Sequence, residues 1–309
     1  FNPGKITDSP KMDDRSLFRF APGYKIDDFP TKLNWNAWPG AASGLQGAVE
    51  MCNNNGACRK LEGGAMCPSF RATHDERDST RGRANSLRLA LSGQLGPDAL
   101  ISDAMTETMK LCVSCKACKR ECPTGVDMAR MKVEVTALRA EAKGLSFHDW
   151  LIAHLPRYSP YMAAMAPVIR LRDIVPGAAW LSEKLTGFTA RRPLPRWQRK
   201  WFRDNELPQT PNEGVISTTE KPPLLLFIDS FNRYFEPENL RAAIRVLRAT
   251  GYDVFVPSPP DSGRPLCCGR TYLSTGLIDL AREEAGRLAA TLAPFARAGI
   301  PIVGLEPSC

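Results

Sequence analysis

The sequence predicts two folded domains: a largely helical domain that carries most of the cysteines, followed by an α/β domain built on a parallel sheet. Seven of the ten cysteines lie between residues 44 and 143, where the apolar residues around them recur at helical spacing. From residue 222 onward, apolar runs typical of strands alternate with amphipathic runs typical of helices. Such alternation implies a parallel sheet with right-handed crossovers.

The composition indicates a folded protein without a membrane-spanning segment. The chain has 309 residues, 43% of them hydrophobic, but runs such as "LLLFI" at 224–228 are far shorter than the roughly 20 residues of a spanning helix. The first residues, "FNPGKITDSP", lack the pattern of a secretion signal. We therefore expect a cytoplasmic protein whose cysteines stay reduced and bind metal, with peripheral contact at the inner face of the cytoplasmic membrane as an alternative. The net charge of +8 suits an anionic partner, an anionic membrane face or negatively charged metal clusters, and charge alone does not choose among them.

Residues 1–43 and 44–143 differ in pattern. Residues 1–43 are rich in Pro, Gly, Asp and aromatic residues without sustained periodicity, which predicts an extended connector. Residues 44–143 are expected to form helices and cysteine-bearing loops, with helical apolar spacing in "SLRLALSGQL" and "MARMKVEVTALRAEAKG". Because the chain starts without a methionine and stops just after an apolar run, we expect it to be a piece of a longer polypeptide.

Residues 144–221 are predicted to be a helical, basic linker. Its stretch "RRPLPRWQRKWFR" combines six basic and three aromatic residues, a composition that suits a neighbouring domain best, a membrane surface next and nucleic acid least. Prolines are expected to divide the preceding part into brief helices. The expected breaks are at Pro156, Pro160, Pro167 and Pro176.

Residues 222–309 are predicted to form the α/β domain. The expected strands are "PLLLFID", "DVFVPS" and "IPIVGLE", and the expected helices are "ENLRAAIRVLRATG" and "LIDLAREEAGRLAATLAPFARAG". Cys267 and Cys268 follow the second strand, and Cys309 follows the third. Because the carboxyl ends of parallel strands meet at one edge, where ligands usually bind, these three cysteines could form a redox site, either as cluster ligands or as reactive thiols. The alternative is that they are ordinary buried side chains.

Four cysteines of the helical domain match a motif that holds iron–sulfur clusters, C-x2-C-x2-C-x3-C-P. Three thiolates at this spacing can cover three corners of a 4Fe-4S cube, while in two-cluster ferredoxins the fourth cysteine turns to the other cluster. The motif therefore predicts an α-helical, ferredoxin-like domain with a second cysteine run elsewhere. A structural zinc site is the alternative. The matching residues are Cys112, Cys115, Cys118 and Cys122, which Pro123 follows.

The second run is irregular. It consists of Cys52, Cys58 and Cys67, and Asn55 stands where a regular motif would have its middle cysteine. If the crossing rule holds, the first set of ligands is Cys67, Cys112, Cys115 and Cys118, and the second is Cys52, Cys58 and Cys122. The second set is one thiolate short, so Asn55, another side chain or water would complete it, a three-iron cluster would form, or the site would be empty.

No catalytic residue is predicted, because His74, His148 and His154 are isolated from one another. Ser79 or Thr80 is expected to cap a helix whose first turns are basic. Its arginines could neutralise the charge of a cluster, pair with another domain, or form a solvated basic face. These arginines are Arg81, Arg83 and Arg88.

Several stretches resemble a known family. "CVSCKACKRECPTGVDMARMK" and "MCPSFRATHDERDSTRGRANSLR" resemble the ferredoxin part of bacterial FAD-linked D-2-hydroxy-acid dehydrogenases of the D-lactate and D-2-hydroxyglutarate type. "FIDSFNRYFEPENLRAAIRVLRATGYDV", "CCGRTYLSTGLIDLAR" and "GLEPSC" resemble the cysteine-rich CCG domain of that family, which recurs in heterodisulfide reductase. "FNPGKI" resembles the closing segment of the flavoprotein domain.

This resemblance implies that the chain is the iron–sulfur part of a fused flavoenzyme. Residues 1–43 would include the tail of an absent FAD-binding domain of the same polypeptide, and residues 222–309 would be a truncated CCG-type domain. Electrons would pass from reduced FAD through 4Fe-4S clusters to a quinone, a cytochrome or an electron-transfer protein. The alternative is a thiol–disulfide module of the heterodisulfide reductase kind that uses the CCG cysteines.

Overall fold

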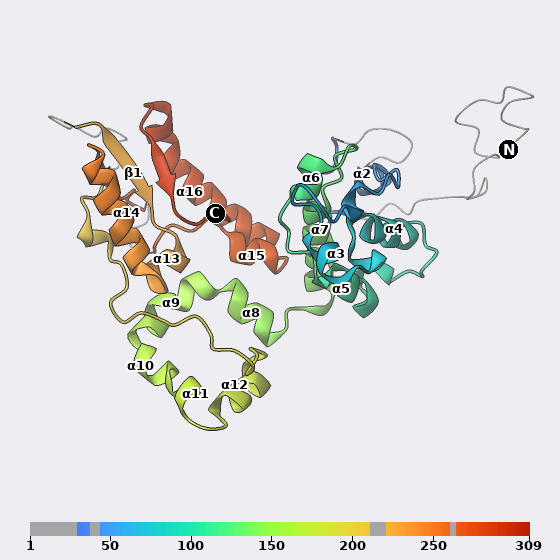
Figure 1. The fold of residues 1–309 in the computed structure, drawn as a ribbon, viewed down its shortest axis with the longest axis horizontal. Helices are drawn as coiled ribbons and strands as arrows, with labels where there is room; N and C mark the ends of the chain where they lie inside the picture. The colour runs from blue at the N-terminus through green and yellow to red at the C-terminus, as the bar shows by residue number, and fades with distance from the viewer. Residues whose placement is uncertain (1–29, 38–43, 211–220, 260–263) are drawn as a thin grey trace, which may run out of the picture. The chain divides into compact units, whose positions relative to one another are not determined.

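The computed structural model describes residues 30–37, 44–210, 221–259 and 264–309. The chain folds as two compact units, which divide between Ala142 and Lys143 (Figure 1). Most of the predicted connector of residues 1–43 lies outside the described residues. The predicted basic linker and the predicted α/β domain, residues 144–221 and 222–309, belong to the same unit.

The first unit is helical, as the sequence predicts. The side chain of Ser79 accepts a hydrogen bond from the Gly82 N–H, so Ser79 rather than Thr80 caps the basic helix α4. The two stretches with helical apolar spacing fall on α4 and α7. The helices are α2 (Gly44–Glu50), α3 (Pro68–Thr73), α4 (Thr80–Leu91), α5 (Asp103–Lys110), α6 (Ala117–Glu121) and α7 (Met128–Lys143).

Apolar side chains from α2, α4, α5 and α7 form one core in this unit. Leu87 of α4, Met109 of α5 and Met131 of α7 are almost completely buried in it. Cys52, Cys58 and Cys118 are buried members of the same core, and Cys67, Cys112 and Cys122 pack against it. Six of the seven cysteines thus lie in or against closely packed surroundings, where side chains have little freedom to move.

A buried carboxylate attaches residues 30–37 to α7. The side chain of Glu134 accepts hydrogen bonds from the backbone N–H groups of Lys32 and Leu33, at 2.6 and 2.9 Å, and from the indole N–H of Trp35, at 2.9 Å. Glu134 is fully buried, and a carboxylate is tolerated there only when its oxygens are hydrogen-bonded. These bonds therefore hold Trp35 in the core.

The second unit begins with brief helices, as the prolines predict. Pro156 and Pro167 lie in the first turns of α9 and α10, and Pro176 lies just before α12. The expected break at Pro160 is wrong, because Pro160 lies inside α9, where the buried side chains of Ser159 and Ala163 hold the helix against the rest of the unit. The helices are α8 (Phe147–Ala153), α9 (Leu155–Ala164), α10 (Ala166–Ile169), α11 (Leu171–Ile174) and α12 (Ala178–Thr186).

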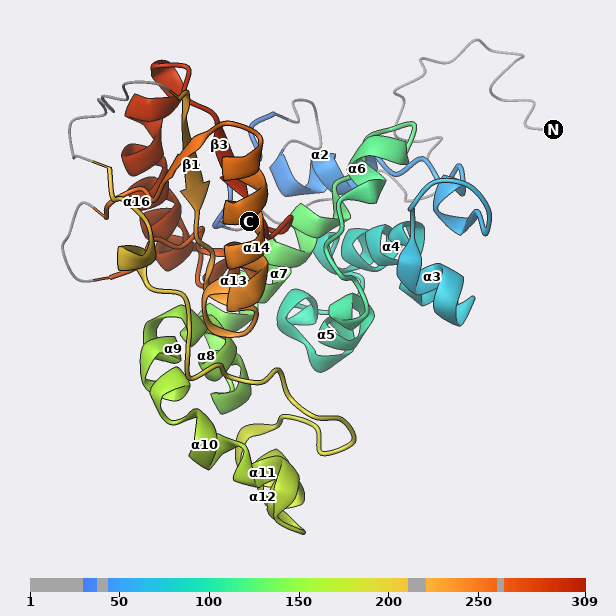
Figure 2. The same cartoon turned by 60° about the vertical axis from the view of Figure 1, so that its left-hand side comes forward.

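Three parallel strands form the sheet of the second unit, in the order β2-β1-β3. They are β1 (Pro223–Phe227), β2 (Asp253–Phe255) and β3 (Ile302–Gly304), with Leu224 beside Val254 and Leu226 beside Val303. The predicted strands and their parallel arrangement are confirmed. In both views β1 lies between α14 (Pro237–Ala249) and α16 (Ile278–Arg297), which were both predicted (Figure 2). Two shorter helices, α13 (Ser230–Tyr234) and α15 (Arg270–Ser274), follow the sheet's carboxyl edge.

The basic stretch at 191–203 packs against this sheet unit. Phe202 is fully buried in the core that includes Leu226 and Leu240, and its backbone N–H donates to the Arg233 carbonyl. Trp197 contacts Phe235 with ring centroids 4.3 Å apart. The aromatic residues of the stretch are thus used for packing, while its basic side chains stay outside.

Gly269 has a conformation and surroundings that only glycine fits. Its φ of +80° is left-handed, and a Cβ there would lie 2.6 Å from the Ala281 carbonyl oxygen. We expect Gly269→Ala to lower the free energy of unfolding of this unit by about 1–3 kcal/mol, measured by urea denaturation. Gly286→Ala is the matched control: Gly286 lies in α16 with open space around it, so the change should stabilise by up to about 1 kcal/mol. Equal effects would contradict the prediction.

Candidate functional site

The loop from Cys112 to Cys118 turns tightly because two of its residues are left-handed. Ser114 and Lys116 have φ of 54° and 58°, values that non-glycine residues rarely adopt. Lys116 then serves as the N-cap of α6. Successive backbone N–H groups in such turns form concavities that suit anions. The result is that all three cysteines of the loop line one cavity.

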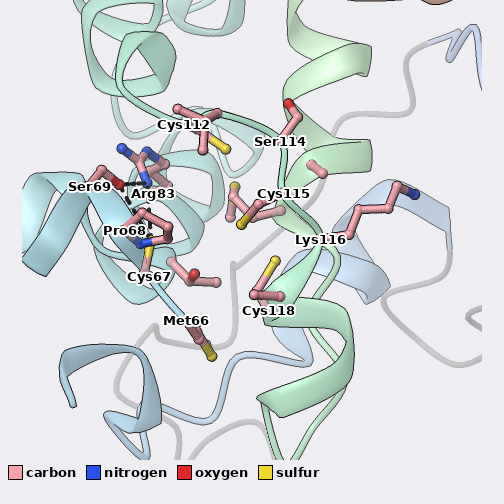
Figure 3. A pocket seen from close by; sticks show the side chains of 15 residues that line it. Met66, Cys67, Pro68, Ser69, Arg83, Cys112, Ser114, Cys115, Lys116 and Cys118 are labelled. Carbon is pink, nitrogen blue, oxygen red and sulfur yellow. Dashed lines mark hydrogen bonds between the residues drawn. The ribbon is translucent and has the colours of Figure 1, made fainter. Parts of the chain in front are cut away.

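Cys67, from the other cysteine run, lines the same cavity. The four cysteines surround a common space, and the cavity has a volume of about 340 Å³ including its open mouth (Figure 3). Its walls also include Met66 and Met128, so they are largely apolar. The structure thus brings together the side chains of the first predicted ligand set. Four thiols that line one cavity suit a 4Fe-4S cluster, although their assignment as ligands stays a prediction.

The Glu121 carboxylate holds the Cys67 loop beside α6. It accepts hydrogen bonds from the backbone N–H groups of Ala65, at 2.8 Å, and Met66, at 2.9 Å. These bonds lower the pKa of Glu121 below its usual range. A Cβ at Gly64 would run into the same carboxylate. Glu121 lies within the motif, between Cys118 and Cys122, so the motif itself carries the group that attaches the distant cysteine loop.

Arg83 of α4 connects the two cysteine runs from inside the protein. It is fully buried and donates hydrogen bonds to Ser69 Oγ, at 3.1 Å, and to the Thr108 carbonyl, at 2.9 Å. One of its nitrogens also lies 3.8 Å from the Cys67 sulfur. Thr108 is in α5, which leads directly to Cys112. The idea that Arg83 belongs to a solvated basic face is therefore wrong.

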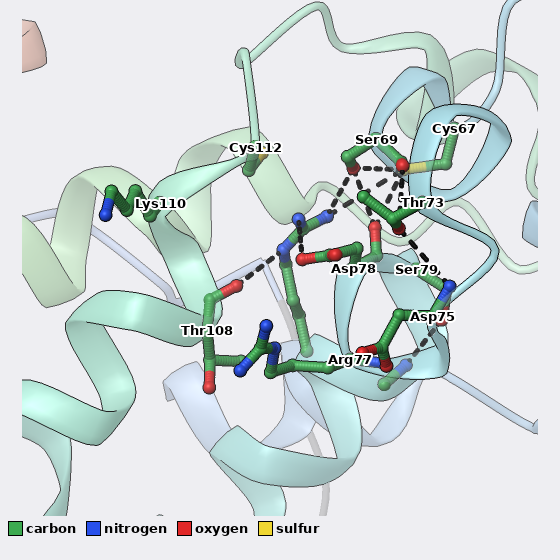
Figure 4. A network of polar contacts seen from close by, with 12 residues as sticks. Cys67, Ser69, Thr73, Asp75, Arg77, Asp78, Ser79, Thr108, Lys110 and Cys112 are labelled. Atoms are coloured by element: carbon green, nitrogen blue, oxygen red, sulfur yellow. Dashed lines mark hydrogen bonds and ion pairs between the residues drawn. The ribbon is translucent and has the colours of Figure 1, made fainter.

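Arg83 also faces a buried carboxylate. Its Nη2 atom lies 3.6 Å from Asp78 Oδ1, an ion pair slightly too long for a hydrogen bond, and neither atom has another hydrogen-bond partner among the described residues. The carbonyl of Asp78 accepts a hydrogen bond from Ser69 Oγ at 2.7 Å, next to the Cys67 sulfur (Figure 4). Burial leaves this pair unscreened by solvent. Arg83 therefore places positive charge beside the cavity.

The thiols around the cavity differ in acidity. Burial would raise the pKa of Cys67, but hydrogen bonds with Ser69 and Thr80 and the charge of Arg83 outweigh burial, so the pKa is lowered. Burial raises the pKa of Cys118 to about 11. Because metal ligation requires the thiolate, the surroundings of Cys67 favour ligation more than those of Cys118 do.

Of the second predicted ligand set, the structure brings Cys52 and Cys58 close to each other. Cys52 and Cys58 are both buried and close enough for a charge on Cys52 to raise the pKa of Cys58, although burial is the main cause of that increase. Cys122 packs against the same core, with its sulfur 3.3 Å from Thr124 Oγ1. The Cys58 sulfur accepts a hydrogen bond from the Arg81 N–H, so it lies at the N-terminus of α4.

Asn55 is engaged in a turn. Its Oδ1 accepts a hydrogen bond from the Ala57 N–H at 2.8 Å, and its Nδ2 donates to Asn53 Oδ1 at 2.6 Å. The side chain is exposed, and Gly56 follows with a φ of +77°. This arrangement is typical of asparagine in a turn and favours a local role over ligation. The Arg88 side chain of α4 donates a hydrogen bond to the Cys52 carbonyl at 2.9 Å and so attaches the start of this cysteine run to α4.

The three cysteines of the second unit lie together at the carboxyl edge of the sheet. The sulfur atoms of Cys268 and Cys309 are 3.1 Å apart, and Cys267 lines the same cavity of about 250 Å³. Asp229, directly after the first strand, lines it as well. A hydrogen bond from Cys267 and another from Cys309 lower the pKa of Cys268, while the pKa values of Cys267 and Cys309 are raised. The trio thus favours a single thiolate, on Cys268.

Sequence reasoning missed Glu121, Ser69 and Asp78. Polar residues near a motif carry no distinctive spacing, so nothing in the sequence alone marks them. Arg83 was named but not placed, although it shares a helix face with Leu87 and Leu91 at intervals of four residues. In the part of the chain that the structure describes, no three His, Cys, Asp or Glu side chains converge on the site of a single metal ion.

Comparison with known families supports the cysteine motif. Residues 48–126 match the family described as "4Fe-4S dicluster domain", and this range contains all seven cysteines of the two runs. This part of the chain is therefore similar to that family of domains. No solved structure matches the chain.

Curated relatives cover most of the chain. It is 27% identical over 296 residues to D-2-hydroxyglutarate dehydrogenase of Pseudomonas putida, covering 83% of this chain and 28% of that protein. It is 24% identical over 348 residues to D-2-hydroxyglutarate dehydrogenase of Escherichia coli, covering 99% of this chain and 33% of that protein. The chain therefore spans a third or less of the length of the relatives it matches.

We expect Arg83→Met to lower the free energy of unfolding by about 3 kcal/mol or more, because it leaves the buried Asp78 carboxylate without its counter-charge. Urea denaturation of the anaerobically prepared chain measures this. Arg77→Met, at an exposed position of the segment before α4, should change the same free energy by less than about 0.5 kcal/mol. A similar effect of the two substitutions would mean that Arg83 does not connect the cysteine runs.

Proposed function

We propose that the chain is the electron-transfer part of an FAD-dependent D-2-hydroxy-acid dehydrogenase. The names of its relatives indicate D-2-hydroxyglutarate as the substrate. Cys67, Cys112, Cys115 and Cys118 hold one 4Fe-4S cluster. Cys52, Cys58 and Cys122 contribute to a second site. The clusters supply one-electron transfer between flavin and an acceptor, which is a quinone, a cytochrome or an electron-transfer protein.

The observation that carries this proposal is the position of Cys67. Helices α3, α4 and α5 lie between the two cysteine runs in the sequence, yet the Cys67 thiol lines the same cavity as the thiols of Cys112, Cys115 and Cys118. That pairing is what a two-cluster ferredoxin needs, since each run gives its last cysteine to the other cluster. The dicluster family match over residues 48–126 supports the same interpretation.

The chain's own residues prepare this site for a negatively charged group. Arg83 brings positive charge next to Cys67, and the left-handed turns at Ser114 and Lys116 form an anion-binding backbone concavity. At the second site, the N-terminus of α4 places the positive end of a helix dipole at Cys58. Each of these features favours thiolates and a cluster over neutral thiols.

The flavin and the substrate site belong, in this proposal, to a further domain of the same polypeptide. All the relatives are named D-2-hydroxyglutarate dehydrogenase and are about three times as long as the matched part or longer. Residues 222–309, with their parallel sheet and cysteine trio, would then be a CCG-type domain.

The test is to prepare the chain with and without the flavin-bearing part. We expect D-2-hydroxyglutarate to be oxidised, and a one-electron acceptor to be reduced, only when both parts are present. Cys115→Ser in the joined protein should leave reduction of the flavin by substrate intact and abolish acceptor reduction, because it interrupts the path after the flavin. Substrate oxidation by the 309-residue chain alone would contradict the proposal.

A second candidate function is thiol–disulfide chemistry at Cys268 and Cys309, favoured by their sulfur separation of 3.1 Å and the lowered pKa of Cys268. A substrate disulfide would be reduced to two thiols while these cysteines form a disulfide, which electrons from the clusters would reduce again. Disulfide reductase activity that is lost in Cys268→Ser and kept in Cys115→Ser with dithiothreitol as reductant would support this function. No such activity would exclude it.

A further inference from the structure

An apolar surface on the second unit has no role in the function proposed above. Nine of the seventeen large hydrophobic side chains that are exposed in the described residues fall within residues 161–186, which we call the apolar arm. Ile174 is 70% exposed, Leu185 66% and Trp180 60%. Exposed apolar clusters of this kind mark interaction sites.

The apolar arm has almost no core of its own. No side chain of α11 or α12 is buried, and α10 buries only Ala166. In both views of the fold these helices lie beyond α9, on the side away from the sheet. The apolar residues here therefore do not stabilise the unit by packing, and something else must cover them if they are to contribute.

The protein's positive charge is concentrated around this arm. Residues 144–203 contain ten Lys and Arg against three Asp and Glu, a net charge of +7, whereas the whole chain has +8. Among the described residues, Arg191, Arg192 and Arg196 are exposed, and their side chains form no ion pair. An anionic partner would be attracted to these charges.

Specific contacts fix the basic stretch beside the apolar arm. Arg172 of α11 donates to the Thr189 carbonyl at 2.7 Å, and the Ala190 N–H donates to the Glu183 carboxylate of α12 at 3.0 Å. Residues 191 and 192 follow directly. Lys184 also lies over the Trp180 ring, 6.0 Å from its centroid. Exposed tryptophan, aliphatic side chains and arginines thus occur on one continuous part of the unit.

We propose that the apolar arm is a peripheral docking surface for a lipid bilayer that contains anionic phospholipids. Helices of this kind insert aliphatic and aromatic side chains at the level of the headgroups, while flanking basic residues contact phosphates. In the described residues no helix is long and apolar enough to cross a bilayer, so the contact is confined to one face of it.

Other partners fit the observations less well. A second copy of the chain, docked arm to arm, would also bring two basic stretches of residues 191–203 toward each other, and like charges repel. Nucleic acid would satisfy the arginines but leave side chains such as Ile174 and Leu185 exposed to water. A bilayer satisfies both the charge and the apolar area.

The experiment is flotation of the 309-residue chain with vesicles of phosphatidylglycerol and phosphatidylcholine, compared with vesicles of phosphatidylcholine alone. We expect binding to the mixed vesicles and at least about tenfold weaker binding to the neutral ones. Ile174→Ser, Trp180→Ser and Leu185→Ser combined should weaken binding to mixed vesicles by at least about tenfold. Arg191→Gln, Arg192→Gln and Arg196→Gln combined should remove most of the preference for anionic vesicles and its sensitivity to salt.

A matched control uses exposed apolar residues outside the arm. Leu95→Ser and Val246→Ser replace side chains that are 54% and 62% exposed, and they should leave vesicle binding unchanged. Circular dichroism and iron content should be the same in all variants, since none of the substituted side chains is buried. Equal losses in the control and arm variants would overturn the proposal. So would failure to bind mixed vesicles, or a dimer that the arm substitutions dissociate.

Discussion

The structure of the first unit depends on the buried guanidinium of Arg83. From α4 it reaches Ser69 and Cys67 on one side and the Thr108 carbonyl on the other, where α5 leads to Cys112. Two cysteine runs that are distant in sequence are thereby fixed around one cavity. The guanidinium cannot lose its charge, and its burial requires the Asp78 carboxylate beside it. Arg83 lines the cavity and Asp78 does not, so the positive member of the pair is the one that faces the thiols, where it favours a cluster of negative charge.

Much of this arrangement could be predicted from the sequence, because the spacing of cysteines limits which of them can bind the same cluster. Intervals of three residues and a following proline indicate one loop and one cluster. Because the fourth cysteine, Cys122, turns to the other cluster, the same motif predicts that a cysteine of the other run, Cys67, completes the first. The parallel sheet followed from alternating patterns, and the rule that its strand ends share an edge anticipated the meeting of Cys268 and Cys309. The full length of helix α9 was harder to predict, since a proline usually ends a helix. Here Pro160 lies inside the helix, between the buried side chains of Ser159 and Ala163.

The rest could not be predicted because it depends on which way single side chains point. Asn55 stands where a regular motif would have a cysteine. Its side-chain oxygen instead accepts a hydrogen bond from the Ala57 N–H, in a turn where Gly56 has a left-handed conformation. Glu121 is one acidic residue among many until its contacts with Ala65 and Met66 are seen. The exposed apolar arm was also hidden, because amphipathic spacing shows that a helix has an apolar face but not whether another part of the chain covers it.

Whether Cys67 shares a cluster with Cys112 or with Cys58 decides how the two cysteine runs work together. Low-temperature EPR of the anaerobically prepared, reduced chain can distinguish the two by comparing Cys67→Ser, Cys112→Ser and Cys58→Ser. We expect Cys67→Ser and Cys112→Ser to change the same cluster signal and Cys58→Ser to leave that signal unaltered. If Cys67→Ser and Cys58→Ser change one signal while Cys112→Ser changes another, each run holds its own cluster, which contradicts the shared cavity as a cluster site.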